Sequence, residues 1–528
     1  MILYCDLETT GLDRKNDRII IGGFKVDDQE IWTEYPTFSQ KVREILANPD
    51  VVKVGHNFLF DCAFLEKAGY TVRGEIRDTR VLAFGKWPYD KLKLKHLGKT
   101  ILGQEVLELK SLRGRGKKVE DISKPILEGY CKQDVQLTFD LYQLLYPTRS
   151  HWIDTVEFGL TGILKQIEER GIYLDADKLG SLHTLWSGEV KDITGRHTIN
   201  LNSHQQVLSH LQERGFNGKA TDKVSLKSAT SGVSICKEIL RYRELSTLVG
   251  RYSGPFLKTH NRGYLHGEFN QAGQEKNDRA VKTGRLSSSN PNLQNIPARS
   301  ANGKLFRKCF TAPPGFKLIV ADAGQIEPRF VAHFTQDQTL IDIFTSGIDF
   351  HGVVTEAAFG RKTYTSDERF VGKTLGLATM YLAQEYRLMM ELRKYDVFLP
   401  LAEVKRRQDG IKRKFGSVIE WGKRYTAQAE HKGYFTTYGG RRYPYSKDIA
   451  VFNNMIQSSQ ADYIKLCCAG IEELGHKIVN VIHDEVLVYT KEPERAVEDI
   501  NRVMSTAISL GDIPVIADVR IVESWGDK

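Results

Sequence analysis

The sequence lacks the patterns that mark membrane, secreted and zinc-binding proteins. No run of apolar residues approaches the roughly 18 that a membrane span needs. Asp6 and Glu8 lie where a secretory signal would need its apolar region, so no export signal is evident. The seven cysteines are scattered and never spaced as CxxC, which argues against a disulfide framework and against a zinc site. These absences indicate a reducing, intracellular compartment, where we expect the cysteines to be buried apolar residues.

Long linkers rich in Pro, Gly or Ser are also missing, as are tandem repeats and low-complexity tracts. A chain of 528 residues is several times the usual domain size, so we expect two to four domains with compact joints. Up to about residue 145, strand-like runs alternate with amphipathic helical stretches, which predicts an α/β sheet domain. A mainly helical stretch follows, and then residues 301–345 and 430–528 are predicted to form one domain that a helical insertion interrupts.

Positive charge exceeds negative charge and is clustered. Lys and Arg number 75 against 66 Asp and Glu, a net charge of +9. Residues 91–99, 110–118 and 405–416 each have the composition to follow a phosphate backbone, although one such stretch alone is more often a solvated face. Together they modestly favour a polyanionic partner.

Four carboxylates and a phenol near the amino terminus have the chemistry of a metal site. "YCDLETTG" places Asp6 and Glu8 two apart on a strand, so both side chains point to one face. Like charges on one face repel unless a cation lies between them, and oxygen ligands favour Mg²⁺ or Mn²⁺. "GHNFLFDCAFL" adds Asp61, and "YCKQDVQLTFDL" adds Tyr130 and Asp134 at helical i, i+4 spacing. Hydrolysis of a phosphodiester with two metal ions needs such a set.

A second acidic group lies toward the carboxyl terminus. The predicted strand "KLIVAD" ends on Asp322, and "KIVNVIHDEVLVYT" places His483, Asp484 and Glu485 in the turn of a hairpin. Burying such charges without partners is costly, so they are either salt-bridged or face a site that holds cations. Asp322 and Asp484 are far apart in sequence and have to meet on adjacent strands to share such a site.

The helix "DERFVGKTLGLATMYLA" supplies the opposite charge. Arg369, Lys373, Leu377 and Tyr381 lie four apart and share one broad face, with two cations followed by two groups that can pack on a base. Cations at this spacing repel each other unless an anion lies opposite, and a nucleotide triphosphate would serve. In isolation, a solvated basic patch is the commoner explanation.

Eight segments fall in an order that fits one family. The three amino-terminal segments resemble the proofreading 3′ to 5′ exonuclease domain of DNA polymerase family A, the DNA polymerase I family. "TGRLSSSNPNLQNIP", "DAGQIEPR", "RFVGKTLGLATMY", "NNMIQSSQADYIK" and "VIHDEVLV" resemble its polymerase motifs in order. The resemblance covers nearly the whole chain.

This resemblance implies an α/β and α+β multidomain fold. A ribonuclease H-like 3′ to 5′ exonuclease domain is expected over residues 1–148 and a right-hand polymerase domain over 149–528. Within the second domain we expect a thumb at about 150–300, a palm at about 301–345 and 430–528, and fingers at about 346–429.

The resemblance also implies roles for individual residues. Two Mg²⁺ or Mn²⁺ ions per active site are expected, held by Asp6, Glu8, Asp61 and Asp134 in one site and by Asp322 and Asp484 in the other. Tyr130 is expected to orient the attacking water, Glu485 to stand beside the polymerase ligands and Lys373 to donate a proton to pyrophosphate. The expected dNTP-binding residues are Arg369, Lys373, His351, Glu327, Gln325, Leu377 and Tyr381, with Glu327 as the gate that excludes a ribose. The expected DNA-binding residues are Arg285, Arg299, Arg441, Asn453, Gln457 and His483.

Two departures from the family pattern carry predictions. "DAGQIEPR" replaces the usual D-Y-S-Q-I-E-L-R, and Pro328 requires the following helix to start at or near it, since proline is tolerated only in the first turn. Leu377 stands where the family carries Phe or Tyr, and Ala378 where Gly is common. We hypothesise altered discrimination of the sugar or base, including use of a modified nucleotide; neutral accommodation by neighbouring packing is the alternative.

The predicted function is template-directed extension of a primer by dNTPs through two-metal phosphoryl transfer in DNA replication, with proofreading. The alternatives are a specialised repair or translesion polymerase and, from another class, a non-catalytic DNA-binding scaffold, which would not need its metal carboxylates. Expected partners are primer-template DNA, dNTPs and a helicase or other replisome protein. We expect a monomer without membrane contact in the cytoplasm of a bacterial or phage-infected cell, with no preceding 5′ nuclease and no large thumb insertion.

Overall fold

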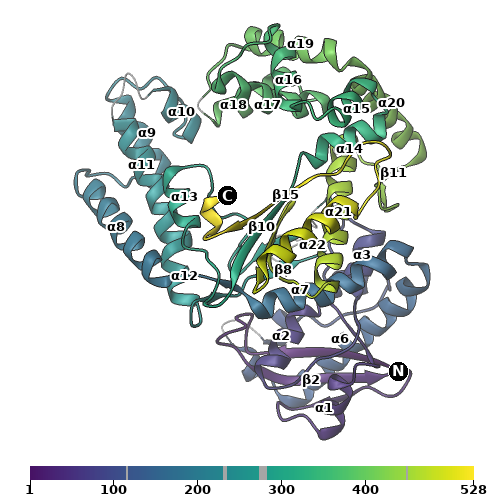
Figure 1. Ribbon diagram of the computed structural model, residues 1–528. Coiled ribbons are helices and arrows are strands. Elements are labelled where there is room, and N and C mark those ends of the chain that lie inside the picture. The colour runs from purple at the N-terminus through teal and green to yellow at the C-terminus, as the bar shows by residue number, and fades with distance from the viewer. Residues whose placement is uncertain (114–116, 230–234, 273–281, 396, 448–449) are drawn as a thin grey trace.

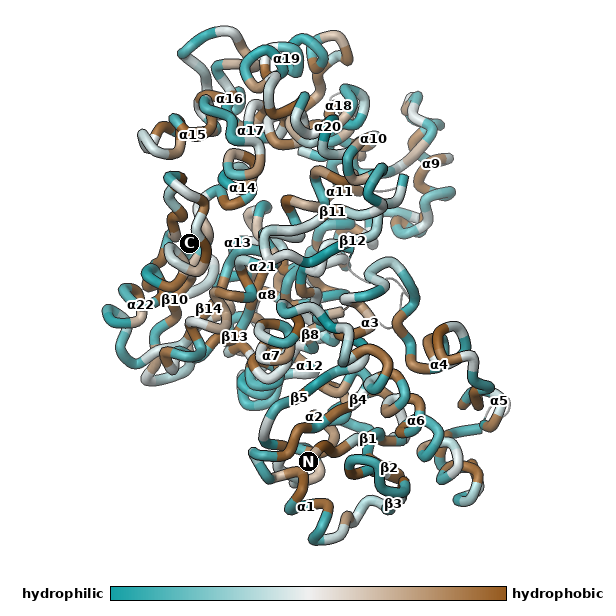
Figure 2. Tube along the Cα trace, turned by 90° about the vertical axis from the view of Figure 1, so that its right-hand side faces the viewer, coloured by the Kyte–Doolittle hydropathy of each residue, from teal (hydrophilic) through white to brown (hydrophobic). Residues whose placement is uncertain are grey.

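The computed structural model describes residues 1–113, 117–229, 235–272, 282–395, 397–447 and 450–528. Part of the basic stretch 110–118, residues 114–116, lies outside them. The amino-terminal sheet domain lies at one end of the molecule in both Figure 1 and Figure 2, and the helices of residues 338–432 lie at the other end. A second sheet, from the carboxyl-terminal half, lies between them.

The amino-terminal sheet has five strands in the order β3-β2-β1-β4-β5. Strand β1 pairs antiparallel with β2 and parallel with β4, so it is central. Side chains alternate between its faces, and Leu3, Cys5 and Leu7 pack in one core while Tyr4 packs in another. The strands are β1 (Ile2–Thr9), β2 (Ile19–Val26), β3 (Trp32–Glu34), β4 (Val52–Gly55) and β5 (Ile76–Asp78).

Helices cover both faces of this sheet. The core of Leu3 and Cys5 includes residues of α1 (Gln40–Ala47) and α2 (Leu59–Lys67), whereas Tyr4 packs against the long helix α6 (Lys124–Leu145). The remaining helices are α3 (Thr79–Lys86), α4 (Leu94–Thr100) and α5 (Leu109–Arg113), of which α4 and α5 stand out to one side in Figure 2. The even-numbered face of β1 is therefore the face that meets α6.

A π-helical turn, η3 (Ile153–Glu157), and α7 (Phe158–Arg170) connect this domain to the rest of the chain. Helix α7 contacts β5 on one side and α21 (Val451–Glu473) and β13 (Lys477–Ile482) on the other. An ion pair of 2.6 Å between Arg14 Nη1 and Glu168 Oε2 ties a loop of the first domain to this helix.

A helical arm follows. Helices α8 (Ala176–Gly195) and α11 (Ile235–Thr247) pack side by side, and α9 (His204–Gln212) and α10 (Lys223–Ser228) lie at the end of the arm in Figure 1. At its base lie η4 (Leu248–Ser253), α12 (Gly254–Thr259) and α13 (Ala301–Arg307). The short strands here are β6 (Ile172–Tyr173), β7 (Tyr264–Leu265), β8 (Glu268–Asn270) and β9 (Ser287–Ser289).

The second sheet is antiparallel, with the order β13-β14-β10-β15. Both faces of β10 (Lys317–Ala323) are buried: Ile319 and Ala321 share a core with residues of α21 and α22 (Pro493–Thr506), while Leu318 and Val320 pack with residues of α12 and α13. Its neighbours are β14 (Glu485–Thr490) and β15 (Ala517–Val522). Asp322 shares the face of Leu318 and Val320 because side chains alternate along a strand.

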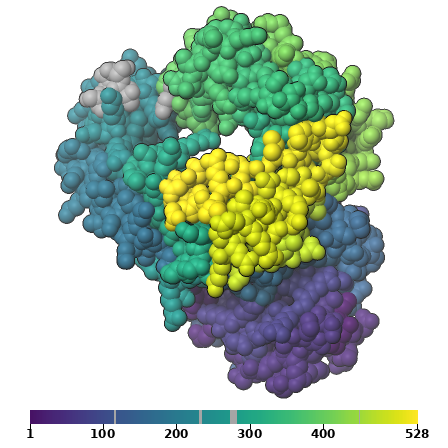
Figure 3. Space-filling model, in the orientation of Figure 1, coloured from purple at the N-terminus to yellow at the C-terminus, as the bar shows by residue number. Residues whose placement is uncertain are grey.

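Residues 338–432 form a helical cap above this sheet (Figure 1). Helix α14 (Ile326–Thr335) leads from β10 to it, and β11 (Tyr434–Thr436) and β12 (Arg442–Pro444) follow it. Figure 3 shows an opening bounded by the cap, the arm and the carboxyl-terminal strands. The cap helices are α15 (Gln338–Thr345), α16 (Phe350–Phe359), α17 (Ser366–Met380), α18 (Glu385–Arg393), α19 (Leu401–Lys414) and α20 (Gly416–Lys432).

The structure contains a first sheet near the amino terminus and a second sheet whose strands β10 and β13–β15 lie before and after the helices of residues 338–432. All seven cysteines are buried and unpaired, as expected. Among the described residues, no helix combines the length and apolar character that a membrane span would require.

Candidate active sites

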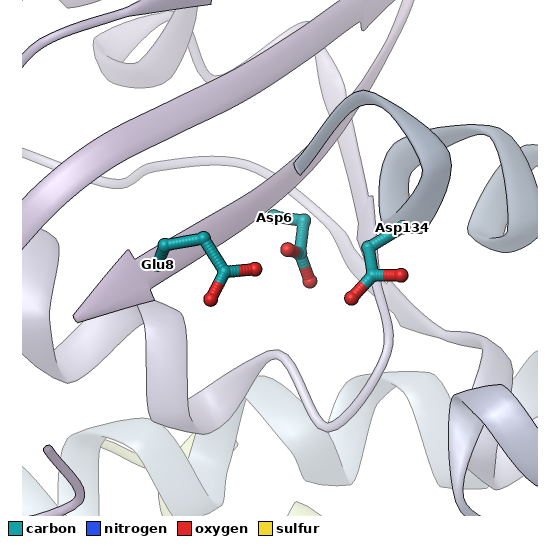
Figure 4. A group of neighbouring side chains, drawn as sticks. All are labelled: Asp6, Glu8 and Asp134. Carbon is teal, nitrogen blue, oxygen red and sulfur yellow. The ribbon is translucent and has the colours of Figure 1, made fainter. Parts of the chain in front are cut away.

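Asp6, Glu8 and Asp134 form a compact carboxylate cluster (Figure 4). Asp6 and Glu8 extend from the face of β1 that meets α6, and Asp134 extends toward them from the middle of α6. One oxygen of each carboxylate lies within 4.8 Å of the others. The strand period of two and the packing of α6 on β1 thus bring together three of the four predicted ligands.

Asp61, the fourth predicted ligand, lies beside this cluster. It is buried in the first turn of α2, and its Oδ1 accepts a hydrogen bond from the backbone N–H of Leu7 at 3.1 Å. Its charge contributes to raising the pKa of Asp6 and Glu8. Asp61 therefore fastens α2 to the central strand while adding negative charge to the site.

Tyr130 and Asp134 occupy successive turns of α6, and Lys95 of α4 touches both. The ammonium group of Lys95 donates to Asp134 Oδ1 and lies 4.0 Å from the centroid of the Tyr130 ring. Sequence reasoning placed Tyr130 correctly beside Asp134 but missed Lys95. Lys95 belongs to the alternating stretch "KLKLKHLGK", whose charge predicts contact with a phosphate backbone or a solvated face and not a carboxylate partner.

The electrostatics of the cluster favour a bound cation. Burial, followed by the negative charges of its neighbours, raises the pKa of Asp6 and Glu8 well above the usual range. Burial also raises the pKa of Asp134, to about 6, although Lys95 opposes this shift. An all-oxygen donor set that repels itself fits Mg²⁺ or Mn²⁺.

The second predicted pair also meets. Asp322, near the end of β10, lies opposite Glu485 of β14, and Asp484 occupies the turn between β13 and β14. The backbone N–H of Ala323 donates to the carbonyl oxygen of Asp484 at 3.2 Å, which holds the turn against the end of β10. His483, beside it, has a left-handed φ of 56°. Asp322 and Asp484 do come together, as expected, but Asp484 lies in the turn beside the adjacent strand and not on the strand itself.

The charged form of the Asp484 carboxyl group is disfavoured in this site. Burial, and then the charges of Asp322 and Glu327, raise its pKa to about 7, while Arg285 opposes the shift. An oxygen-only pair with such mutual repulsion fits a divalent cation here as well.

Two carboxyl-terminal residues hold the neighbouring acids. The ammonium group of Lys528 donates to Asp322 Oδ2 at 2.8 Å and also to Glu485 Oε2. The indole N–H of Trp525 donates to Glu485 Oε1 at 2.7 Å. Glu485 therefore points toward the carboxyl-terminal residues, and sequence reasoning missed both of its partners.

Glu327 lies in the first turn of α14, between two predicted partners. Its Oε1 accepts from Arg285 Nη2 at 2.5 Å and its Oε2 from the Tyr381 hydroxyl at 3.0 Å. Arg285 also donates to Gln460. The three predicted residues Glu327, Arg285 and Tyr381 are therefore brought together. Helix α14 begins at Ile326, directly after Gln325 with φ 55°, so Pro328 lies in its first turn as predicted.

The predicted triphosphate residues gather on α16 and α17. Burial, followed by the positive charges of Lys373 and Arg369, lowers the pKa of His351 to about 4. Arg369 forms a bidentate ion pair with Asp349, with a shortest distance of 2.8 Å. Lys373 is exposed and Leu377 is half-buried against the core of the cap.

The predicted DNA-binding residues divide into two groups. Asn453 and Gln457 are half-buried on the first turns of α21, His483 is exposed, and the guanidinium of Arg299 lies 4.6 Å from the Tyr395 ring centroid. Arg441 differs from the expectation of a surface contact.

Arg441 is 7% exposed, and its guanidinium pairs with Asp462 and lies 3.8 Å from Glu157. Lys465 completes this buried network with a 2.7 Å bond to Glu157. The partners come from η3, from α21 and from the segment before β12. In this structure Arg441 therefore joins elements of the fold, and sequence reasoning missed its partners because they are distant along the chain.

Comparison with known proteins gives a match to each of the two parts of the chain. The family model described as DNA polymerase family A matches residues 176–527, and the model described as 3′-5′ exonuclease matches residues 2–148. DNA polymerase I of Pseudomonas aeruginosa is 26% identical over 100% of this chain and 63% of its own length. The thermostable DNA polymerase I of Thermus filiformis is 32% identical over 73% of this chain and 50% of its own length. The chain thus spans between half and two thirds of these relatives.

A solved structure shares the fold. The POL domain of Pol1 from M. smegmatis, in complex with DNA primer-template and dNTP, has a TM-score of 0.82, 24% sequence identity, and coverage of 99% of this chain and 96% of that one. Both carboxylate sites lie inside the matched ranges.

Proposed function

The chain belongs to DNA polymerase family A, and from that premise we propose that it extends primer 3′ ends on a DNA template and removes misincorporated nucleotides with a 3′ to 5′ exonuclease. The observation that carries this proposal is the presence of two separate carboxylate sites, one within each matched region. We infer that the protein serves DNA replication, since one chain with both activities could copy a template and correct its own errors.

The proposed polymerase site uses Asp322 and Asp484 to hold two Mg²⁺ or Mn²⁺ ions. When bound, these ions neutralise charge on the transferring phosphate and lower the pKa of the primer hydroxyl. Arg369 and Lys373 on α17, with His351 on α16, grip the triphosphate, and Lys373 donates a proton to the leaving pyrophosphate. Asp349 must release Arg369 for this grip, since the two are paired in the structure.

Glu327 is proposed to select deoxynucleotides. Arg285 and Tyr381 hold its two carboxylate oxygens, so the side chain cannot swing away from a 2′ hydroxyl without losing both bonds. A carboxylate fixed in this way excludes a ribose by its bulk, while leaving space for deoxyribose. Gln325 and Leu377 complete the proposed nucleotide site.

The proposed exonuclease site uses Asp6, Glu8, Asp61 and Asp134 to hold two ions, with Tyr130 orienting the attacking water. A single-stranded 3′ end has to reach the cluster between β1 and α6. Because ions held by carboxylates would act on the phosphate, which every nucleotide shares, we expect the site to accept any 3′ nucleotide.

The proposed organisation is an exonuclease domain over 1–148 and a polymerase domain over 149–528. Within the polymerase domain, the helical arm is the thumb (about 150–300), the second sheet the palm (about 301–345 and 430–528) and the cap the fingers (about 346–429). The proposed partners are primer-template DNA, dNTPs and a helicase or other replisome protein. We place the protein, as a monomer, in the cytoplasm of a bacterium or phage-infected cell, where its substrates are found.

Asn453, Gln457 and His483 are proposed to contact the primer end and the minor groove, where acceptors common to all base pairs report pair shape. Arg285 and Arg299 are proposed to hold DNA as well. The buried partners of Arg441 favour an indirect role, in which it supports the nearby helix α21 that carries Asn453 and Gln457.

One assay tests the proposal. A labelled primer annealed to a template is incubated with the protein and Mg²⁺, with dNTPs present or withheld. We expect extension when dNTPs are present and shortening when they are absent. Asp484→Ala abolishes extension and spares shortening, and Asp6→Ala with Glu8→Ala does the reverse. Survival of both activities in either variant would contradict the assignment of the sites.

A further inference from the structure

Lys95 reaches the exonuclease carboxylates because α4 packs very closely on α6. Leu97 of α4 is buried in the core that contains residues of α6. Gly98 allows the close approach, since a Cβ at this position would lie 2.9 Å from Leu137 Cδ2. Lys95 lies about one turn before Gly98 on α4, and its side chain therefore reaches the middle of α6. The position of this ammonium group is thus built into the packing of two helices.

The Lys95 ammonium contacts two functional groups on successive turns of α6. It donates to Asp134 Oδ1 and lies 4.0 Å from the centroid of the Tyr130 ring. A cation over an aromatic face is attracted by the ring's electron density, and this attraction is stronger where water is partly excluded. The Lys95 side chain is 14% exposed and that of Asp134 is 9% exposed. The Lys95 ammonium group therefore holds both the Asp134 carboxylate and the Tyr130 ring.

We propose that Lys95 is a positioning residue of the exonuclease site, which fixes the Asp134 carboxylate and the Tyr130 ring relative to each other. This inference rests on the proposed exonuclease function. With Oδ1 held by Lys95, the Asp134 carboxylate keeps one orientation within the cluster where a cation would bind. With its ring held against the ammonium, Tyr130 keeps its hydroxyl in one place for the attacking water.

Variants of Lys95 can distinguish whether the residue acts through its positive charge or only through the space that its side chain fills. Lys95→Met keeps the length of the side chain and removes its charge, while Lys95→Arg keeps the charge. Lys99 supplies the control, since it lies one turn later on α4 with a side chain 49% exposed and pairs with Glu108 at 3.0 Å. All variants are made in the full chain with Asp484→Ala, so that bound Mn²⁺ reports mainly on the exonuclease site.

The measurements are the kcat and KM for excision from single-stranded DNA, the Mn²⁺ binding isotherm without DNA, and the thermal unfolding midpoint. We expect Lys95→Met to lower kcat roughly 10- to 100-fold, the usual effect of removing a group that orients a metal ligand, with KM and Mn²⁺ binding retained. Lys95→Arg should recover part of the loss, and Lys99→Met should match the parent protein.

Two results would overturn the inference and leave the proposed function intact. One is an unchanged kcat in Lys95→Met. The other is a parallel loss of kcat, Mn²⁺ binding and thermal stability that Lys95→Arg does not recover, because that pattern shows a purely structural lysine. Failure of the Asp484→Ala parent protein to shorten DNA would instead overturn the proposed exonuclease and, with it, the role of Lys95.

Discussion

The two carboxylate sites differ in where along the chain their parts come from. In the proposed exonuclease site, three carboxylates within 4.8 Å extend from one strand and one helix. In the polymerase site, Asp322 lies near a strand end and Asp484 in a hairpin turn. In the first site two of the carboxylates share one face of a single strand, whereas the two aspartates of the second site come from segments far apart in the sequence.

The sites also differ in how negative charge is balanced. Lys95 binds a cluster member directly, since its partner is Asp134. Lys528 pairs with Asp322 of the second site and also with Glu485, while burial and neighbouring negative charges raise the pKa of Asp484. Glu8 therefore belongs to its cluster, while Glu485 faces away from Asp484 toward Trp525 and Lys528. This difference can be tested one residue at a time.

The largest expected effect is the difference in kcat between substitutions of Glu8 and of Glu485. Glu8→Gln should lower exonuclease kcat on the order of a hundred- to a thousandfold, because it removes a charge from the reacting cluster. Glu485→Gln should lower polymerase kcat only about tenfold, because Glu485 acts through its neighbours. Single-turnover excision and extension assays measure the two effects. Equal losses would show that both glutamates play the same part and would break the comparison.

The next effect concerns stability without metal. The pKa of Asp134 is about 6 in the folded chain, above its ordinary value of 3.8, so the folded state holds this proton more tightly than the unfolded state. The free energy of unfolding therefore falls as the pH rises through this range, by up to about 3 kcal/mol. Asp134→Asn should reduce that fall, while the raised pKa values of Asp6 and Glu8 should leave part of it in place. Urea denaturation in EDTA at several pH values between about 4.5 and 7 measures it.

Lys95 offsets part of the free-energy cost of the Asp134 charge. The control variant is Asp140→Asn, because Asp140 is a partly buried residue of the same helix outside the cluster. A fall in stability with pH that persists unchanged in Asp134→Asn would assign it to other groups.

A smaller effect is expected from Lys528. Lys528→Met removes the cation that occupies Asp322, so Mn²⁺ should bind the polymerase site more tightly, by about fivefold for a partly exposed ion pair worth about 1 kcal/mol. Mn²⁺ titration in the Asp6→Ala, Glu8→Ala background measures this affinity. Lys317→Met is the control, since Lys317 pairs with exposed Glu523 at 2.8 Å on the same sheet. Weaker binding in Lys528→Met would mean that Lys528 helps to shape the site.

The smallest effect concerns Leu377, which has no counterpart in the exonuclease cluster. Leu377→Phe or Leu377→Tyr should change the ratio of dideoxy to deoxynucleotide incorporation about five- to tenfold, corresponding to roughly 1 kcal/mol of altered ring contact. Competition between the two nucleotides in a primer-extension assay gives the ratio. An unchanged ratio would show that packing in the cap absorbs the difference.

The exonuclease cluster was largely predictable from the sequence because its geometry follows local periodicity. Residues two apart on a strand share a face, which gives Asp6 and Glu8, and residues four apart on a helix are neighbours, which gives Tyr130 and Asp134. The placement of Pro328 in the first turn of α14 was predictable for a similar reason, because the chemistry of proline restricts where a helix can begin.

The ion-pair partners were not predictable, because they depend on packing between distant segments. Lys95 meets Asp134 only through the close approach of α4 to α6. Arg441 contacts Glu157, which lies far from it along the sequence. The Arg441 side chain is buried with this partner and is not exposed. No local pattern distinguishes such residues from ordinary surface cations.

The order of strands in the second sheet has a consequence for biosynthesis. Strand β10 pairs on its two sides with β14 and β15, which the ribosome makes only after the whole helical cap. Amino-terminal domains generally fold first as a chain emerges, so the first sheet and α6 can pack while β10 still has two unpaired edges. The nascent polypeptide can thus assemble the cluster of Asp6, Glu8 and Asp134 before the pair of Asp322 and Asp484.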